Sequence, residues 1–127
     1  MMKIKSVSGV ICYVKNINKT VKFYETLGFV FKKIEPHRAT AYVNWFWIDF
    51  LSVDKESSPE FRKEAKLSNK GAGTFLYLSV DNVDDFHKAL LSKGIKPLSK
   101  PQDSPWGNRE FVLRDPDGYK LVIFKRL

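Results

Sequence analysis

Apolar side chains recur every three to four residues in two segments of the chain. This spacing places them on one face of a helix. They are Ile17, Val21, Tyr24 and Leu27 in the first segment and Val83, Phe86, Ala89 and Leu90 in the second. Asn16 and Asn82 precede the segments, and Gly28 and Gly94 follow them. An asparagine oxygen can accept from free N–H groups at a helix start, and glycine can close a helix in a left-handed cap. The pattern predicts two helices of about three turns.

The two helices belong to a faint internal repeat. A constant shift along the chain aligns Val14–Phe29 with Val80–Ile95. One strand is predicted before each helix and three after it, from short apolar stretches bounded by turn residues. The predicted strands are Ser8–Val14, Phe29–Glu35, Arg38–Asn44 and Phe46–Val53, then Thr74–Val80, Ile95–Ser99, Glu110–Arg114 and Tyr119–Lys125. Each half therefore reads βαβββ, and the fold class is α+β.

Two further segments complete the organisation. Residues 54–73 are predicted to link a first module of about 5–53 to a second of about 74–127, within one domain. A short helix near 59–67 is expected, because Ser58-Pro59-Glu60 offers a cap, a first-turn proline and an acid. Asp115-Pro-Asp-Gly118 is expected to form a type I turn between the last two strands.

Composition narrows the classes of protein. The 127 residues carry a net charge of +8, but their 22 Lys and Arg are spread along the chain without a basic stripe or a nucleic-acid-binding motif. No apolar run is long enough to cross a membrane, and the N-terminus lacks the features of a signal peptide. The single cysteine, Cys12, fits a reducing cytoplasm and is expected to be a small buried hydrophobe.

Three motifs, read together, resemble one known family. They are Phe23-Tyr24 followed by Leu27-Gly28-Phe29, Leu78-Ser-Val-Asp-Asn82, and Arg109-Glu-Phe111 leading into the Asp115–Gly118 turn. They are similar to motifs of the vicinal oxygen chelate superfamily, which includes glyoxalase I, extradiol dioxygenases, fosfomycin-resistance enzymes and bleomycin-resistance proteins. The resemblance covers nearly the whole chain. It implies paired modules whose mixed sheets curl around a cavity, and it commonly implies a homodimer.

The resemblance also implies four metal-ligand positions. In metal-dependent members they hold two histidines and two acids, and here they fall at Gly9, Asp49, Phe75 and Val122. A catalytic divalent ion needs about three protein ligands, and three of these four side chains have no donor atom. We therefore predict no metal and no cofactor, so that the strand after the Asp115–Gly118 turn only lines a wall.

Alternation along the strands then predicts an aromatic cavity with one carboxylate, which suits a flat organic ligand. Trp106 joins it as a loop residue flanked by proline and glycine. The predicted ligand contacts are Tyr13, Trp47, Asp49, Phe75, Tyr77, Trp106, Arg109 and Phe124. Asp49 could pair with a ligand, or with an internal arginine such as Arg109.

The leading functional interpretation is a metal-independent small-molecule binding protein that sequesters an aromatic or anionic organic ligand in a dimer cavity, without catalysis. Bleomycin itself is a poor match, because it is cationic and the chain is basic. A second interpretation is an atypical lyase, isomerase or dioxygenase that uses Asp49 as base or sole metal ligand, with Glu35, His37 or Glu110 as candidate partner acid. A third is an interaction or regulatory module without a ligand.

Overall fold

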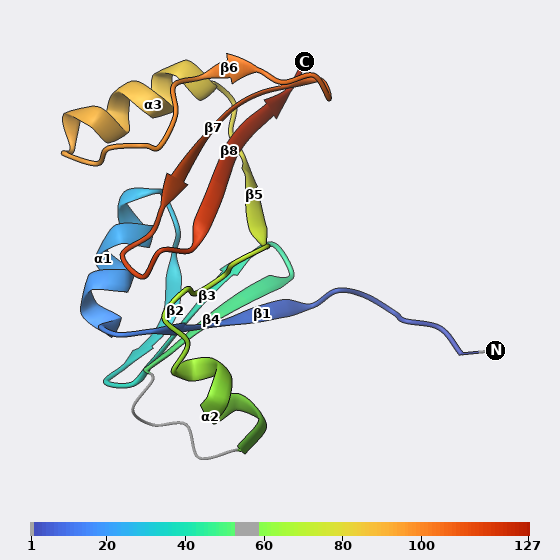
Figure 1. The fold of residues 1–127 in the computed structure, drawn as a ribbon, viewed down its shortest axis with the longest axis vertical. Coiled ribbons are helices and arrows are strands. Elements are labelled where there is room, and N and C mark those ends of the chain that lie inside the picture. The colour runs from blue at the N-terminus through green and yellow to red at the C-terminus, as the bar shows by residue number, and fades with distance from the viewer. Residues whose placement is uncertain (1, 53–58) are drawn as a thin grey trace. The chain divides into compact units, whose positions relative to one another are not determined.

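The computed structural model describes residues 2–52 and 59–127, and these form two compact units that divide between Ser68 and Asn69. Each unit has one four-stranded mixed sheet, in the order β1-β4-β3-β2 in the first unit and β5-β8-β7-β6 in the second (Figure 1). In both, the strand before the helix pairs in parallel with the last strand, and the other pairs are antiparallel. The predicted α+β class with two βαβββ modules is confirmed.

The elements follow the predicted order. The first unit contains β1 (Gly9–Val14), α1 (Ile17–Thr26), β2 (Phe31–Glu35), β3 (Arg38–Val43), β4 (Phe46–Ser52) and α2 (Pro59–Ala65), and the second contains β5 (Phe75–Ser79), α3 (Val83–Ser92), β6 (Gln102–Asp103), β7 (Asn108–Arg114) and β8 (Lys120–Arg126). The predicted cap at Ser58 lies outside the described residues. No helix in the part of the chain that the structure describes has the length and apolar character needed to cross a membrane.

The two long helices begin in the same way. Asn16 Oδ1 accepts from the backbone N–H of Lys19 at 3.0 Å, and Asn82 Oδ1 accepts from that of Asp85 at 3.0 Å. Both asparagines have extended backbone, as N-cap residues do. The asparagines of the sequence repeat therefore start both helices.

The helices also end alike. Gly28 and Gly94 have φ of 104° and 81°, which a residue with a Cβ adopts only under strain. Beyond them, the N–H of Phe29 donates to the carbonyl of Tyr24 at 2.9 Å, and that of Ile95 donates to Leu90 at 3.0 Å. These are the long bonds of a Schellman cap.

Each helix covers one face of its own sheet. In the first unit, Tyr24 of α1 packs on Phe50 of β4 with 4.7 Å between ring centroids, and both are fully buried. In the second, His87 of α3 meets Phe111 of β7 edge to face at 4.9 Å. Other sheet residues that belong to the two cores are also buried. Ile48, Leu113, Leu121 and Ile123 are at most 3% exposed. Burial of these side chains stabilises each unit by about 1.5–3 kcal/mol per large residue.

One predicted strand is wrong. Ile95–Ser99 has no strand structure, and the short strand β6 follows it at Gln102–Asp103. Pro97 and Pro101 cannot donate to a ladder. The segment instead makes two isolated bonds to Val112, whose carbonyl accepts from Leu98 at 2.8 Å and whose N–H donates to the Ser99 hydroxyl at 2.9 Å.

The Asp115–Gly118 turn sets the register of the last two strands. The N–H of Gly118 donates to the carbonyl of Asp115 at 3.0 Å, and Asp115 Oδ1 accepts from the N–H groups of Asp117 and Tyr119. The turn therefore pairs Arg114 with Lys120. Every second residue back along β7 then faces away from α3, and this alternation builds one wall of the site described next.

Candidate ligand pocket

The face of the second sheet that α3 does not cover is aromatic and accessible. Phe75 and Tyr77 project from β5 and are 47% and 45% exposed. Tyr77 pairs with Val122 of β8, which pairs in turn with Val112 of β7, so the three side chains share this face. Large apolar side chains left half exposed on a sheet face are typical of a binding surface.

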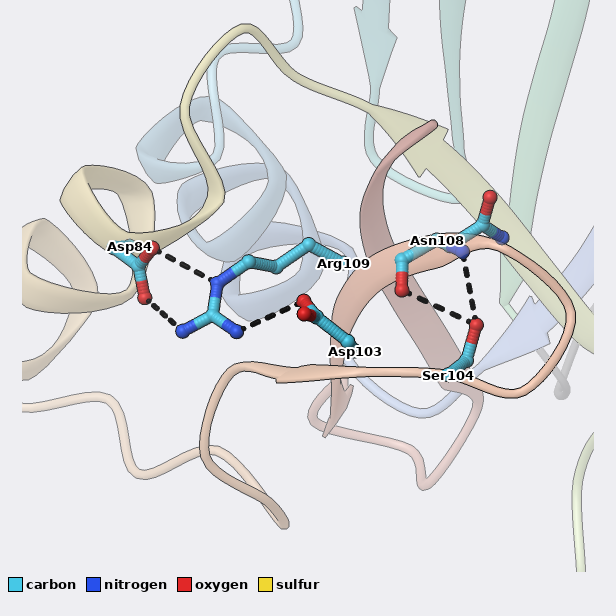
Figure 2. A network of polar contacts seen from close by, with 5 residues as sticks. All are labelled: Asp84, Asp103, Ser104, Asn108 and Arg109. Atoms are coloured by element: carbon cyan, nitrogen blue, oxygen red, sulfur yellow. Dashed lines mark hydrogen bonds and ion pairs between the residues drawn. The ribbon is translucent and has the colours of Figure 1, made fainter. Parts of the chain in front are cut away.

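A tight turn between β6 and β7 forms the rim of this face. The N–H of Gly107 donates to the carbonyl of Ser104 at 3.1 Å, with Pro105 and Trp106 as the central residues. Gly107 has φ of 94°, the left-handed conformation that follows a type I turn in a hairpin with a bulge. The Ser104 hydroxyl accepts from the N–H of Asn108 at 3.0 Å and donates to its carbonyl at 3.2 Å (Figure 2). Trp106 is therefore held at the rim with 62% of its surface exposed.

The face and the rim enclose a pocket of about 540 Å³, a volume typical of small-molecule sites. Its walls combine aromatic rings, two valines, the rim turn and two acids. The lining residues are Phe75, Tyr77, Gln102, Asp103, Ser104, Pro105, Trp106, Glu110, Val112 and Val122. All of them belong to the second unit.

Glu110 is the most buried polar group of the pocket. It is 8% exposed, and its Oε1 accepts from the indole Nε1 of Trp106 at 3.0 Å and from Nδ2 of Asn108 at 3.2 Å. The bond to Trp106 fixes the orientation of the indole on an otherwise exposed turn. Glu110 therefore connects the floor of the pocket to its rim.

Arg109 directly precedes Glu110 on β7, so its side chain points to the opposite face of the sheet. Its guanidinium donates to both carboxylate oxygens of Asp84 on α3, at 3.0 and 2.9 Å, and to Asp103 of β6 at 3.1 Å (Figure 2). Hydrogen bonds from Arg109 lower the pKa of Asp84, and those to Asp84 and Asp103 raise the pKa of Arg109. Arg109 does not line the pocket; it ties the rim strand β6 to the start of α3.

The remaining predicted contacts of this unit lie on or beside the pocket. Phe75, Tyr77 and Trp106 line it. Phe124 lies on the same face of the sheet and packs edge to face on Tyr77 with 5.3 Å between centroids, beside the pocket wall. Lys120 Nζ lies 5.4 Å from the centroid of the Phe75 ring.

The predicted contacts of the first unit are arranged differently. Tyr13 is buried at 6% exposure. Gly9 and Trp47 are neighbours in the parallel pair β1–β4, and the Trp47 indole lies against the Gly9 backbone so closely that a Cβ at position 9 would overlap it. The indole therefore fills the space that a side chain on β1 would take.

Asp49 is engaged within its own sheet. Its Oδ2 accepts from Arg38 at 2.5 Å, and its Oδ1 accepts from the Thr40 hydroxyl on the neighbouring strand β3. The hydrogen bond and charge of Asp49 raise the pKa of Arg38. The suggested internal partner, Arg109, is wrong; the partner is Arg38, which lies two positions from Thr40 on the same face of β3.

The four family metal positions do not fit a divalent ion. Gly9, Phe75 and Val122 bring no side-chain donor, and both oxygens of Asp49 are already hydrogen-bonded. Nor do three His, Cys, Asp or Glu side chains gather anywhere else in residues 2–52 and 59–127. In the second unit the positions carry apolar side chains, Phe75 and Val122, that form pocket wall.

Several pocket residues are not among the ligand contacts predicted from the sequence. Gln102, Asp103, Ser104 and Val112 are absent from that prediction, and Glu110 enters it only as a candidate partner acid for Asp49. For Val112 and Glu110 the sequence does contain a signal. Val122 and Phe124 are predicted to face the cavity, and the residues directly opposite them on the antiparallel neighbouring strand must share that face. Glu110 pairs with Phe124 and Val112 with Val122. A slip of one residue at the turn would have reversed this assignment, so the register was needed.

Comparisons with known proteins extend the picture. The sequence profile of the Glyoxalase/Bleomycin resistance protein/Dioxygenase superfamily matches residues 6–123. A Bacillus subtilis (strain 168) protein, YraH, is 29% identical over 119 residues, which are 90% of this chain and 93% of YraH.

Solved structures agree on the fold. Virulence protein STM3117 from Salmonella typhimurium superimposes with a TM-score of 0.77 at 23% identity, over 99% of this chain and 100% of that one. A glyoxalase/bleomycin resistance protein/dioxygenase from Nocardioides superimposes with a TM-score of 0.79 at 19% identity, over 100% of this chain and 87% of that one. At these identities the likeness concerns the fold alone.

Proposed function

The chain belongs to the glyoxalase/bleomycin resistance protein/dioxygenase superfamily, and from this premise we propose that it is a metal-independent small-molecule binding protein. Its ligand is a flat, aromatic organic molecule, held in the pocket of the second unit. Binding sequesters the ligand without transforming it.

The observation that carries this proposal is the pocket's combination of walls. Half-exposed Phe75 and Tyr77 face a pocket of about 540 Å³ whose rim presents the indole of Trp106. Rings offer a large contact area at small entropic cost and stack on planar molecules. The two family metal positions in this unit, Phe75 and Val122, are apolar, so this face suits contact with a ligand and not ion coordination.

Asp49 supports binding over catalysis as well. A general base must lie within hydrogen-bond reach of its substrate. Asp49 is only 4% exposed, and Arg38 and Thr40 hold its two oxygens within the sheet. The arrangement favours a structural role for Asp49 in the first sheet.

We also propose that the protein works as a homodimer in a reducing cytoplasm. Exposed apolar side chains on the first sheet and its hairpin support self-association, since Ile11, Tyr42 and Trp45 are 39%, 42% and 72% exposed. The single cysteine is consistent with a compartment in which disulfides are rare. Sedimentation of the purified protein tests the dimer.

A thermal-shift screen against planar aromatics, phenolics and organic acids tests the binding function. A ligand that binds only the folded state raises the melting temperature. The Phe75→Ala and Trp106→Ala variants should lose the shift for the same compound, while Phe61→Ala, a half-exposed aromatic on α2 of the first unit, should keep it.

Two measurements distinguish a metal-independent binding protein from an enzyme or an interaction module. Elemental analysis should find no stoichiometric metal, and chromatography of each bound compound should find it unchanged. A stoichiometric ion would contradict metal independence, and product formation that stops in Asp49→Asn would favour the enzyme. No shift with any compound, together with a recovered protein partner, would favour an interaction module.

A further inference from the structure

We propose that Glu110 makes the pocket selective for a positively charged ligand, a planar organic cation with an N–H group to donate. This inference rests on the proposed binding function and names the class of ligand. It keeps the aromatic ligand expected from the sequence and replaces the anionic alternative with a cationic one.

The argument begins with the two oxygens of Glu110. Oε1 is occupied by the donors of Trp106 and Asn108. Oε2 has no hydrogen-bond partner among the described residues, although the side chain is only 8% exposed and lines the pocket. Oε2 is not among the buried polar atoms without a partner in the described residues, so it is open to the pocket. A ligand that covers it displaces its water, and a covered carboxylate oxygen without a donor is costly. A ligand that brings an N–H donor to Oε2 removes this cost, and a charged donor does so most strongly.

The charge of the pocket points the same way. Asp103 is the second acid of the lining, but Arg109 binds it from outside the pocket at 3.1 Å. The pocket-lining residues include no lysine, arginine or histidine. Glu110 is therefore the lining carboxylate that lacks a cationic partner within the described chain, and it would repel a ligand carboxylate or phosphate.

The rings add to this preference. Aromatic faces attract cations through their quadrupole, by about 0.5–2 kcal/mol according to solvent exposure. The molecule already makes one such contact, between Lys120 Nζ and the Phe75 ring at 5.4 Å. Lys120 also opposes a second cation at this edge of the pocket, so its removal should strengthen binding of a cationic ligand.

Three tricyclic probes of one shape test the proposal. They are 9-aminoacridine, which is cationic at neutral pH, acridine, which is neutral, and acridine-9-carboxylate, which is anionic. Fluorescence titration at pH 7.5 and low salt measures their affinities for the full-length protein. We expect the cation to bind about tenfold or more tightly than acridine, as a charge-assisted bond implies, and the anion most weakly.

The Glu110→Gln variant is the decisive change. An amide oxygen can still accept from Trp106 and Asn108, so the rim keeps its two bonds while the charge disappears. The preference for 9-aminoacridine over acridine should fall to about twofold or less. Lys120→Gln removes a positive charge near the pocket, and this variant should bind 9-aminoacridine about two- to threefold more tightly than wild type. Asp85→Asn removes an exposed acid on α3 and should change nothing.

The outcomes separate the two proposals. If the probes bind equally well, or the anion binds best, with no change in Glu110→Gln, charge selection is overturned and the binding pocket stands. If none of the three probes binds, the proposed function falls with it. If Glu110→Gln does not fold, two other measurements test the proposal. It is overturned if the wild-type protein binds 9-aminoacridine no more tightly than acridine, or if Lys120→Gln does not bind 9-aminoacridine more tightly than wild type.

Discussion

The two units share one frame and use the open face of the sheet differently. In the first, Arg38 and Thr40 hold Asp49, and the Trp47 indole lies on Gly9, so polar and aromatic groups satisfy one another within the sheet. In the second, Phe75 and Tyr77 stay half exposed, and one oxygen of Glu110 lacks a partner among the described residues. On this face the first unit pairs its carboxylate internally, and the second leaves two aromatic rings and a carboxylate oxygen open to the pocket.

The first strand after each long helix shows where the difference arises. In the first unit, β2 has five residues, and four of them pair with β3. In the second, Pro97 and Pro101 interrupt the corresponding segment, and only Gln102–Asp103 pairs with β7. The Ser104–Gly107 turn follows this short strand and carries Trp106 at the rim of the pocket. The two copies of the repeat therefore differ at the segment that forms the pocket rim.

The largest expected effects on stability come from the buried ring that each unit has between its long helix and its sheet. Phe50→Ala and Phe111→Ala each remove a fully buried ring under a helix, at 0% and 1% exposure. Each should lower the free energy of unfolding by about 3–5 kcal/mol, measured by urea denaturation. The half-exposed Leu91→Ala should change it by under about 0.5 kcal/mol. A cost under about 1 kcal/mol for either ring would show that the two cores are not equivalent.

Gly9→Ala addresses the packing that is specific to the first unit. The added Cβ would overlap the Trp47 indole, and overpacking of this kind costs roughly 1–3 kcal/mol. Trp47→Ala in the same chain should recover much of that loss, because the overlapping ring is gone. Additive losses in the double variant would mean that the indole does not occupy this space.

Arg38→Met tests whether Asp49 is held internally. The variant leaves a 6%-exposed carboxylate without its cation, and we expect a loss of about 1–2 kcal/mol, moderated because the Arg38 side chain is 55% exposed. Lys33→Met, which breaks the exposed pair with Glu35, is the matched control and should cost almost nothing. Equal effects would assign no special role to the Asp49 contacts.

Arg109→Met tests the attachment of the pocket rim. Without its bonds to Asp84 and Asp103, β6 should open more often, and exchange of the Ser104 and Gly107 amide hydrogens should accelerate roughly fivefold. Arg114→Met, farther along β7, should leave both amides unchanged. If both amides exchange at the wild-type rate in Arg109→Met, the rim is held by the turn alone.

The smallest effect is a pH dependence. Arg109 lowers the pKa of Asp84 in the folded state, so this contact stabilises the protein above the unfolded value of about 3.9 and the contribution is lost as pH falls through the lower folded value. Asp84→Asn should therefore be less stable than wild type near pH 7, and the gap should close in acid. Thermal melts from pH 7 to pH 2 measure the gap. A gap that widens in acid would contradict this sign.

The helices and their ends could be predicted from the sequence, because their causes are local. Asparagine caps, apolar spacing and glycine closures act within one or two turns, and all of them recur in the structure at the predicted residues. Most strands followed from short apolar stretches. The prediction of a strand at Ile95–Ser99 was wrong, because the composition favoured a strand while Pro97 removed a donor that a ladder needs.

The site depended on contacts between residues far apart in the chain. Trp106 could be identified from its loop composition, and Phe75 and Tyr77 from alternation. That Glu110 shares their face depends on the register fixed by the Asp115–Gly118 turn, and a shift of one residue would have reversed it. That Asp49 binds Arg38 and Arg109 binds Asp84 depends on which strands and helices become neighbours. The sequence by itself determined the elements, because hydrogen bonding and capping are local; the tertiary structure decided which carboxylates were satisfied, because that depends on partners the chain brings together only by folding.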